Sequence, residues 1–390
     1  MTVTGATTSV ELREHNRARL LRAVHACGAS RTRSQLTKEL ELARGTASVL
    51  VGGLVADGLL HEEPSAGHGR GRPTQIPGPH PRGPLALAVD LREDAWEIAA
   101  CELGGRLTVL DDWPHQGSPA RTLRPLGDAL RAHIRQYGSR VVGVGLAVPG
   151  PIRDGHLVDV AHLGWRAVDV PALLGALDVP LDVSNDTVCA ALAEARRGRM
   201  AGVRVGLHVH VDFDLGGVLV VDGRPLGGAS GVGAEFGHMP LTGGTGRCMC
   251  GAVGCWGMDM GSNALLRHLG LPAGGGKGRE EAQAILARGD AAARAAVAAN
   301  ATALGTGLAA LVNAHDPEIV TLSGLGLDLH AKAAEPLEAA FHDRLMTIRR
   351  DHPPEIAPST LSRRGPLLGA MESVFDAFLT PEGLRRWRGA

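Results

Sequence analysis

The hydrophobic pattern at the start of the chain predicts three short helices. Apolar residues recur at helical spacing over residues 10–28, and a glycine suited to a helix C-cap ends that segment. A second helix is predicted from about Arg33, and a third from about Arg44 to Asp57, where a glycine follows. Three short helices with tight connections are typical of a helix-turn-helix unit, whose last helix lies in the major groove of DNA.

A hairpin is predicted directly after these helices. The segments LLHEE and TQI have strand composition and flank a glycine-rich tip, SAGHGRGRP, which makes the unit a winged helix-turn-helix. A plain three-helix bundle with a polar hairpin would give a similar pattern, but the order of the helices and the arginine-bearing tip favours DNA binding. Side chains at the start of the third helix reach base edges, and arginines of such a tip enter a narrow minor groove. The expected DNA contacts are Arg44, Thr46, Ala47 and Ser48 on the helix and Arg70 and Arg72 at the tip.

The remainder of the chain has a different pattern, separated from the first by a proline-rich segment. Residues 77–84 (PGPHPRGP) predict an extended linker between a winged helix-turn-helix domain at residues 10–76 and a second domain at residues 85–390. In the second domain, runs of strand length alternate with helical patterns, which predicts an α/β fold with a ligand cleft at the carboxyl ends of the strands. Strands are expected at 85–91, 96–103, 106–113, 141–152 and 318–326, and residues 203–221 have a strand-rich pattern. A strand running into a helix is expected at 181–198, and helices at 122–137, 285–314 and 367–379.

Composition narrows the class of protein. A chain of 390 residues that is 44% apolar and 21% charged is typical of a soluble globular protein of two or three folding units. Its net charge of −1 excludes a uniformly basic surface, although residues 1–75 carry ten Lys and Arg against seven Asp and Glu. The sequence shows no run of about 18 apolar residues and no hydrophobic N-terminal segment. We therefore expect a cytoplasmic protein without membrane association, whose cysteines are thiols.

Residues 233–257 (GAEFGHMPLTGGTGRCMCGAVGCWG) combine one histidine with three of the six cysteines, in the spacing H-x9-C-x-C-x4-C. One imidazole and three thiolates are the ligands that Zn²⁺ prefers in a closed tetrahedral structural site. The alternative is that the thiols are small buried side chains beside an unrelated histidine, but three cysteines within eight residues favour metal. The expected ligands of one structural zinc ion are His238, Cys248, Cys250 and Cys255.

The winged helix with its GRP tip is followed by several short motifs: VGVGLAVPGPI, the LGW of residues 163–165, SNDTVCAALAE, AEFGHM and CMCGAVGC. Together they resemble the ROK family of repressors, open reading frames and kinases, a branch of the actin-like ATPase and sugar kinase fold. The resemblance covers nearly the entire chain from about residue 15. It implies a two-lobed, actin-like domain behind the DNA-binding domain.

The resemblance also implies roles for four polar residues. Asp186 matches the aspartate that acts as general base in the kinases of the family, and Asn185 beside it matches a position that hydrogen-bonds sugar hydroxyls. Glu235 and His238 match further sugar contacts, so His238 would use one ring nitrogen for zinc and the other for the sugar. Taken alone, the Asn-Asp pair at a strand–helix junction is more typical of a helix N-cap. Its coincidence with the metal cluster favours the binding role.

Departures from the family pattern favour a regulator over a kinase. Residues 90–94 (DLRED) stand where the kinases carry Asp-x-Gly-Gly-Thr, and residues 212–216 (DFDLG) stand where they carry Gly-Thr-Gly-Ile-Gly. Carboxylates in both loops would repel the phosphates of ATP. Gly257 replaces a glutamate that touches the sugar, and His162 replaces an asparagine. Either the effector binds in another orientation, or a neighbour compensates, or binding is weakened.

The sequence therefore predicts a sugar-responsive transcriptional regulator, expected to be a repressor of carbohydrate metabolism with a degenerate ATP site. Its expected partners are operator DNA, a sugar or sugar derivative, and further copies of itself, as a homodimer or dimer of dimers. One alternative is an ATP-dependent sugar kinase with Asp186 as the base. The other is a DNA-binding protein whose effector site no longer binds a ligand.

Overall fold

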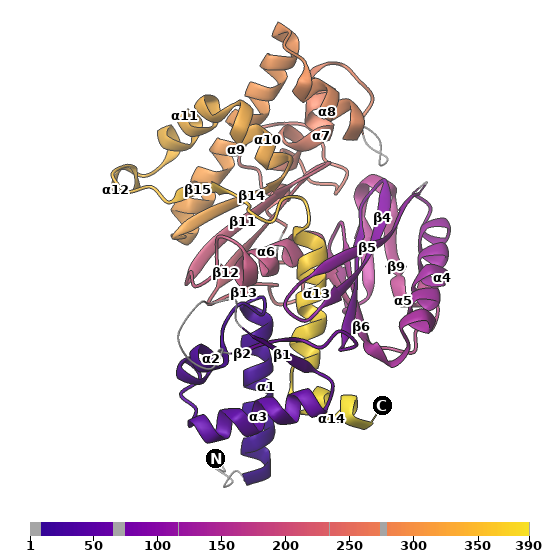
Figure 1. Ribbon diagram of the computed structural model, residues 1–390. Coiled ribbons are helices and arrows are strands. Elements are labelled where there is room, and N and C mark those ends of the chain that lie inside the picture. The colour runs from indigo at the N-terminus through magenta and orange to yellow at the C-terminus, as the bar shows by residue number, and fades with distance from the viewer. Residues whose placement is uncertain (1–8, 65–74, 116, 234, 274–278, 390) are drawn as a thin grey trace, which may run out of the picture.

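The chain folds into a winged helix-turn-helix and two α/β lobes (Figure 1). The structure is a computed structural model. It describes residues 9–64, 75–115, 117–233, 235–273 and 279–389. The elements of the winged helix-turn-helix are α1 (Ser9–Ala26), α2 (Arg33–Glu39), α3 (Arg44–Ala56), β1 (Leu60–Pro64) and β2 (Gln75–Pro79). These elements confirm the predicted order of three helices and a hairpin.

The predicted linker at residues 77–84 begins later than expected. β2 pairs antiparallel with β1 as far as Pro79, which lies opposite Leu60, so residues 77–79 belong to the wing. A proline has no N–H to donate, but each strand of a two-stranded sheet has one side that needs no partner. The two prolines of this segment are therefore compatible with the strand.

The first lobe is a five-stranded sheet in the order β10-β6-β3-β4-β5. Strands β3, β4 and β5 form an antiparallel meander, whereas β6 and β10 run parallel to β3. Helices α4 and α5 pack on one face, and α13 crosses the other face together with α6. The elements are β3 (Leu85–Leu91), β4 (Ala95–Glu102), β5 (Leu107–Pro114), α4 (Pro119–Tyr137), β6 (Val141–Val148), β7 (Ile152–Arg153), β8 (Leu157–Val160), β9 (Trp165–Asp169), α5 (Val170–Leu174), β10 (Leu181–Asn185), α6 (Asp186–Arg197) and α13 (Gly365–Phe378).

The second lobe repeats this topology. Its sheet has the order β15-β14-β11-β12-β13, again an antiparallel meander with two parallel strands added beside the first strand of the meander. Two lobes of the same topology are the architecture expected of an actin-like domain. The elements are β11 (Val205–Val211), β12 (Leu215–Val221), β13 (Arg224–Pro225), α7 (Gly261–His268), α8 (Arg279–Ala287), α9 (Ala291–His315), β14 (Ile319–Gly324), α10 (Leu325–Lys332), α11 (Ala334–Arg344), α12 (Thr347–Arg350) and β15 (Glu355–Pro358).

The long helix predicted at residues 285–314 is in fact the end of one helix and most of another. α8 ends at Ala287, and Asp290 caps α9 by accepting a hydrogen bond from the Ala293 N–H at 3.0 Å. Among the described residues, α9 is the one helix long and apolar enough to cross a membrane, which the sequence analysis did not anticipate. In this fold, 72% of its apolar window is buried, because α9 packs against the second sheet. It is the central helix of a protein core.

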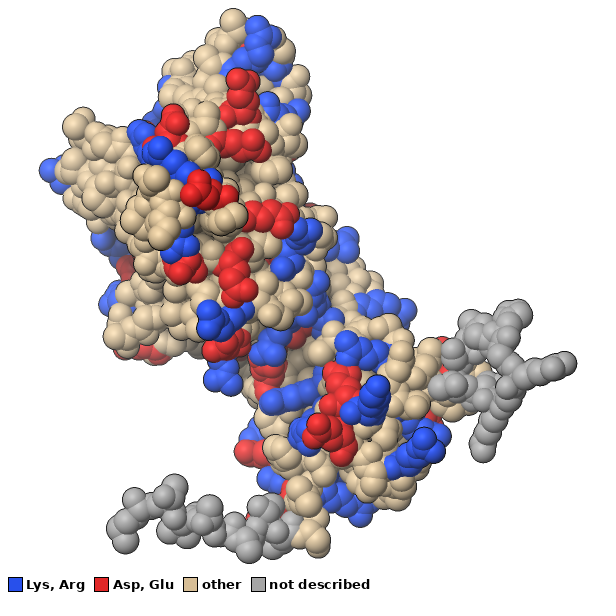
Figure 2. All heavy atoms as spheres, turned by 90° about the vertical axis from the view of Figure 1, so that its left-hand side faces the viewer, with Lys and Arg blue, Asp and Glu red and all other residues tan. Residues whose placement is uncertain are grey.

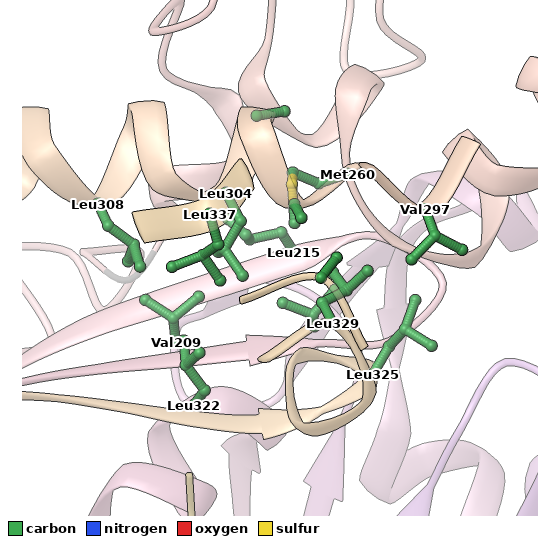
Figure 3. Close-up of a cluster of buried hydrophobic side chains, with 14 of the residues drawn as sticks. Val209, Leu215, Met260, Val297, Leu304, Leu308, Leu322, Leu325, Leu329 and Leu337 are labelled. Atoms are coloured by element: carbon green, nitrogen blue, oxygen red, sulfur yellow. The ribbon is translucent and has the colours of Figure 1, made fainter. Parts of the chain in front are cut away.

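Figure 3 shows that core, in which side chains from the second sheet interdigitate with side chains from the helices above it. Those from the sheet include Val209 and Leu322, and those from the helices include Leu304 and Leu308 of α9 and Leu337 of α11. All five are fully buried. This packing fixes the carboxyl ends of β11 and β14, which reach the space between the lobes.

The winged helix-turn-helix shares a hydrophobic core with the first lobe. Leu21 and Val24 of α1 belong to the same buried cluster as Phe375 of α13 and Leu384 of α14 (Pro381–Gly389), a helix not predicted from sequence. The Trp387 indole N–H of α14 donates to the Asp57 carbonyl at 2.8 Å, at the end of α3. The DNA-binding unit is thus packed onto the lobe, and the C-terminal helices lie between them (Figure 1).

A buried polar network lies in the same interface. Glu372 of α13 is paired with Arg197 at the end of α6 and lies 3.3 Å from the ring of His25 in α1. The Gly104 N–H donates to His25 Nδ1 at 3.0 Å, and Arg197 donates to the Gly104 carbonyl, also at 3.0 Å. Burial raises the pKa of Glu372, but the hydrogen bonds and charges of His25 and Arg197 outweigh it and lower that pKa below its usual range. The network links α1, α6 and α13.

Candidate ligand pocket and metal centre

A cavity of about 780 Å³ lies between the two lobes, at the carboxyl ends of the strands. Asp90 of β3 and Asn185 of β10 line it from the first lobe, and Asp212 and Gly324, at the ends of β11 and β14, line it from the second. Its size is within the range of small-molecule sites. The position agrees with the cleft expected from the alternation of strands and helices.

Asn185 and Asp186 lie where β10 passes into α6. The Asn185 side chain caps the helix, accepting from the Thr187 and Val188 N–H groups at 3.0 and 3.1 Å and donating to the Gly150 carbonyl. Asp186 accepts from the Thr187 N–H at 2.6 Å. Both residues line the cavity, so the N-cap and the pocket are the same feature. The N-cap ties the start of α6 to the wall of the cavity.

The carboxyl group of Asp186 is held in its protonated form near neutral pH. Burial, with a further contribution from the neighbouring carboxylates of Asp90 and Asp212, raises its pKa to about 8. Burial also raises the pKa of Asp90 to about 6, although Arg92 opposes this shift. Protonated carboxyl groups donate hydrogen bonds as well as accept them, which suits a ligand rich in hydroxyl groups.

Glu235 and His238 line the opposite wall. The His238 Nε2 lies 3.5 Å from the Glu235 carboxylate, while its Nδ1 faces the Cys248 thiol at 3.8 Å. Burial is the main cause that raises the pKa of Glu235, and the charge of His238 opposes it. The structure therefore brings four predicted sugar contacts, Asn185, Asp186, Glu235 and His238, to one cavity.

The four predicted metal ligands also lie together. The ligand atoms of His238, Cys248, Cys250 and Cys255 are all within 4.8 Å of one another, and the Sγ atoms of Cys250 and Cys255 are 3.7 Å apart. A tetrahedral zinc ion with Zn–S bonds of about 2.3 Å needs sulfur atoms about 3.8 Å apart. The donor set and its spacing fit a metal ion. Glu235 beside the free nitrogen of His238 would orient the imidazole, as carboxylates do beside metal-bound histidines.

The two acidic loops meet around two arginines. Arg92 lies within 3.5 Å of carboxylate oxygens of Asp90 and Glu97 and 3.6 Å from Asp94, and Arg279 of α8 pairs with both Asp94 and Asp212. Arg279 thus bridges the two lobes, because Asp94 belongs to the first and Asp212 to the second. Sequence reasoning did not identify it, since nothing in residues 279–287 distinguishes it from an ordinary surface arginine.

The DNA-binding residues predicted on α3 divide into two groups. Arg44, Thr46 and Ser48 are exposed, whereas Ala47 is 2% exposed and packs inward with Leu50, so the predicted contact of Ala47 with DNA is wrong. Ala47 precedes Leu50 by three residues, which places both on the inward face of the helix. The first turn of α3 has no side-chain cap, which leaves its N–H groups free to bind phosphate. Arg70 and Arg72 lie outside the described residues.

The surface charge is mixed on the face shown in Figure 2. Lys and Arg are interspersed there with Asp and Glu, and they form no large area of one sign. This agrees with the net charge of −1. This face has no broad basic area that could attract DNA. The expected DNA contacts therefore come from α3 and the wing.

Comparison with known proteins places both parts of the chain. Residues 97–376 match the ROK family and residues 14–71 match the MarR family. The xylose repressor of Bacillus subtilis strain 168 is 24% identical over 360 residues, which cover 89% of this chain and 92% of that protein. A glucokinase of Halalkalibacterium halodurans is 30% identical over 160 residues, which cover 38% of this chain and 48% of that enzyme.

Two solved structures show the same fold. A ROK family transcriptional regulator, a homologue of the E. coli MLC protein, aligns with a TM-score of 0.73 and 24% identity over 97% of this chain and 99% of that one. A ROK family glucokinase from Streptomyces griseus, in complex with glucose and AMPPNP, aligns with a TM-score of 0.62 and 25% identity over 74% of this chain and 98% of that one. Fold and site thus define a winged helix-turn-helix protein with an actin-like domain of the sugar kinase type. With more than half of its length matched, the chain belongs to the ROK family.

Proposed function

We infer that this protein is a DNA-binding transcriptional repressor whose affinity for operator DNA changes when a sugar binds between the lobes. Support comes from the winged helix-turn-helix, the cavity lined by hydroxyl-binding side chains, and the similarity to xylose repressors over nearly the full chain. The observation that carries the inference is the path of α6. The helix begins at Asp186 in the cavity and ends at Arg197 in the network beneath α1.

This helix provides a mechanism for coupling the two sites. At 1.5 Å per residue, twelve residues span about 18 Å. A sugar bound at Asn185 and Asp186 that favours one closure of the lobes moves the start of α6, and Arg197 moves with it. Arg197 is bonded to Glu372 and to the Gly104 carbonyl, while Glu372 and the Gly104 N–H contact His25 of α1. The motion therefore reaches the DNA-binding unit. The ligand acts only through a difference in affinity for the two closures.

We propose that the protein does not phosphorylate sugars. The carboxylates of residues 90–94 and 212–216 occupy the two loops in which the kinases of the family bind phosphate, and Asp94 and Asp212 are joined there by Arg279. A nucleotide would have to break these pairs and face the remaining carboxylates.

We further propose that the protein acts in the cytoplasm as a homodimer or a dimer of dimers that binds a palindromic operator. The DNA contacts come from Arg44, Thr46, Ser48, Arg70 and Arg72. One zinc ion binds to His238, Cys248, Cys250 and Cys255. The zinc would stabilise the wall of the cavity that carries Glu235, since His238 belongs to both. Symmetric operators match symmetric dimers, so sedimentation should show at least a dimer at micromolar concentration.

The test combines DNA selection with a sugar panel. Fragments bound by the full-length protein are selected from random-sequence DNA, and the Kd for the selected fragment is measured with and without each unphosphorylated monosaccharide. We expect at least one sugar to change this Kd by tenfold or more, and no turnover of ATP with any sugar. An unchanged DNA affinity across the panel would contradict regulation by a sugar, and robust phosphorylation would establish the kinase instead.

A further inference from the structure

Three polar residues outside the predicted sugar contacts meet in the same cavity. Glu93 lies in the turn between β3 and β4, His162 in the short helical turn before β9, and Asp214 directly before β12. His162 Nε2 lies 3.1 Å from Asp214 Oδ2, which makes this a contact between the first and second lobes. Sequence reasoning treated His162 and residue 214 as two unrelated departures from the family pattern.

Two buried atoms of this cluster have no hydrogen-bond partner among the described residues. They are Glu93 Oε2 and His162 Nδ1. Glu93 is only 6% exposed, and a buried polar group without a partner destabilises the fold. Both residues line the cavity, although these two atoms have almost no accessible surface in the ligand-free fold. A ligand that enters the cavity can supply the missing hydrogen bonds when the two side chains turn toward it.

The electrostatics of the cluster agree with its geometry. Burial raises the pKa of Glu93 to about 7; the charge of His162 opposes this shift, while Asp212 and Asp214 add to it. For His162, burial lowers the pKa, but the bond to Asp214 and the charge of Glu93 outweigh it and raise that pKa. Near neutral pH the cluster thus holds protons that can be shared with hydroxyl groups.

Gly257 determines where the Asp214 carboxylate lies. A Cβ atom at position 257 would be 1.9 Å from Asp214 Oδ1, so any other side chain there would displace the carboxylate. That oxygen also accepts from the Leu215 N–H at 2.9 Å, and the other oxygen faces His162. The carboxylate of residue 214 therefore fills the space of the side chain that residue 257 lacks.

We propose that Glu93, His162 and Asp214 form a second sugar-contacting subsite, in which Asp214, directly before β12, supplies the carboxylate that position 257 does not. This proposal rests on the proposed function, because it concerns the same cavity. The ligand is an unphosphorylated sugar that places two hydroxyl groups against Glu93 and His162. A phosphate group at this subsite would face the carboxylate of Asp214, so we expect a phosphorylated sugar to bind there more weakly than the unphosphorylated one.

The test uses a double-mutant cycle on the full-length protein, with sugar affinity measured by calorimetry over a panel of unphosphorylated monosaccharides and glucose 6-phosphate. Asp214→Gly should weaken binding of the preferred sugar tenfold or more, because the carboxylate is lost. Gly257→Glu alone should weaken it similarly, because the new side chain collides with Asp214. The double variant should return to within about threefold of the original protein, because a glutamate at position 257 then has room to supply the carboxylate.

Two further variants protect the test against misfolding. Glu93→Gln keeps the shape of the side chain and should weaken sugar binding fivefold or more, with unchanged thermal stability in the absence of sugar. Asp222→Asn, which changes an exposed carboxylate in the turn after β12, is the matched control and should bind like the original protein.

The outcomes separate this proposal from the proposed function. If the original protein binds no sugar of the panel, the proposed function fails and the subsite fails with it. If it binds a sugar and Asp214→Gly and Glu93→Gln bind equally well, the subsite alone is wrong. Tighter binding of glucose 6-phosphate than of glucose would overturn the assignment of an unphosphorylated ligand.

Discussion

Asp186 is the residue of the cavity whose protonation differs most clearly from that in an unfolded chain. Burial and the charges of Asp90 and Asp212 raise its pKa to about 8, whereas an unfolded aspartate has a pKa of about 3.9. Between these values the folded protein binds a proton that the unfolded chain has released. The free energy of unfolding therefore falls as the pH rises through this interval.

We expect the ligand-free protein to lose stability continuously from about pH 5 to pH 8, and Asp186→Asn to flatten this dependence by removing its largest contributor. Urea denaturation at a series of pH values measures the free energy of unfolding of both proteins. Asp90 and Glu93, with pKa values of about 6 and 7, should preserve part of the slope. A variant as pH-dependent as the original protein would show that Asp186 is ionised in the fold.

The metal centre gives a second prediction for single residues. Cys248→Ser should lose stoichiometric zinc and lower the melting temperature, because one thiolate of the tetrahedron is missing. Elemental analysis of the purified protein provides the measurement. Cys27→Ser, which changes a thiol outside the cluster, is the control and should keep its metal. Equal zinc content in both variants would refute the ligand assignment.

Site residues could be predicted where they lie close together in the sequence or at the junction of two elements. The metal ligands lie within 18 residues of one another, and Asn185-Asp186 marks a strand–helix junction. By contrast, the contact between Asp214 and the space above Gly257 joins residues 43 positions apart and depends on how a loop packs against a strand. Arg279 likewise enters the site from a helix whose sequence gives no sign of it.

At the scale of elements, α6 and α13 connect the two sites. The backbones of the two helices are nearly in contact where Gly369 of α13 faces Cys189 of α6. A Cβ atom at Gly369 would lie 1.8 Å from the Cys189 carbonyl oxygen. Such packing leaves little room for one helix to move without the other. The Arg197–Glu372 pair joins them again at the far end, beside α1.

We expect the double variant Arg197→Met, Glu372→Met to bind sugar with an affinity within threefold of the original protein, but to lose the effect of sugar on DNA binding. Replacing both partners avoids an unpaired buried charge, which would cost about 3–5 kcal/mol. The measurement is the DNA Kd with and without sugar. Arg196→Met, which removes an exposed pair with Asp376, is the control and should respond normally. A full response in the double variant would show that the signal takes another path.

Most of the longer elements followed from hydrophobic periodicity, but many others were not predicted: α5, α7, α10, α11, α12, α14, β7, β8, β9, β13 and β15. Two departures show why. The predicted helix at residues 285–314 covers parts of two helices, α8 and α9. The prediction joined them because the alanine-rich pattern continues on both sides of Gly289-Asp290. α14 was missed because PEGLRRWRG is short and polar, and only Leu384 and Trp387 anchor it in the core. Its stability comes from tertiary packing, which sequence periodicity does not report.

At the scale of the whole molecule, the DNA-binding unit and the first lobe are held by one core with the C-terminal helices between them. Deleting residues 381–390 should remove the contacts of Leu384 and Trp387, lower the melting temperature and weaken DNA binding, while sugar affinity stays within threefold. Calorimetry and the DNA-binding assay measure these effects. The cavity lies at the start of α13, where Pro366 lines it, whereas α14 follows the end of that helix. A large loss of sugar affinity would therefore show that α14 also supports the cavity.

The position of α13 and α14 also imposes an order on synthesis. The ribosome releases α1 first and α13, its packing partner, roughly 340 residues later, which takes on the order of 20–70 seconds at typical elongation rates. Throughout this time only the part of α1 that packs against α2 and α3 is covered, and the part that contacts α13 has no partner. A chain that ends before α13 contains the winged helix-turn-helix but lacks the helices that complete its core and connect it to the cavity. Premature termination or C-terminal proteolysis would therefore leave a fragment that binds DNA weakly and that no sugar regulates.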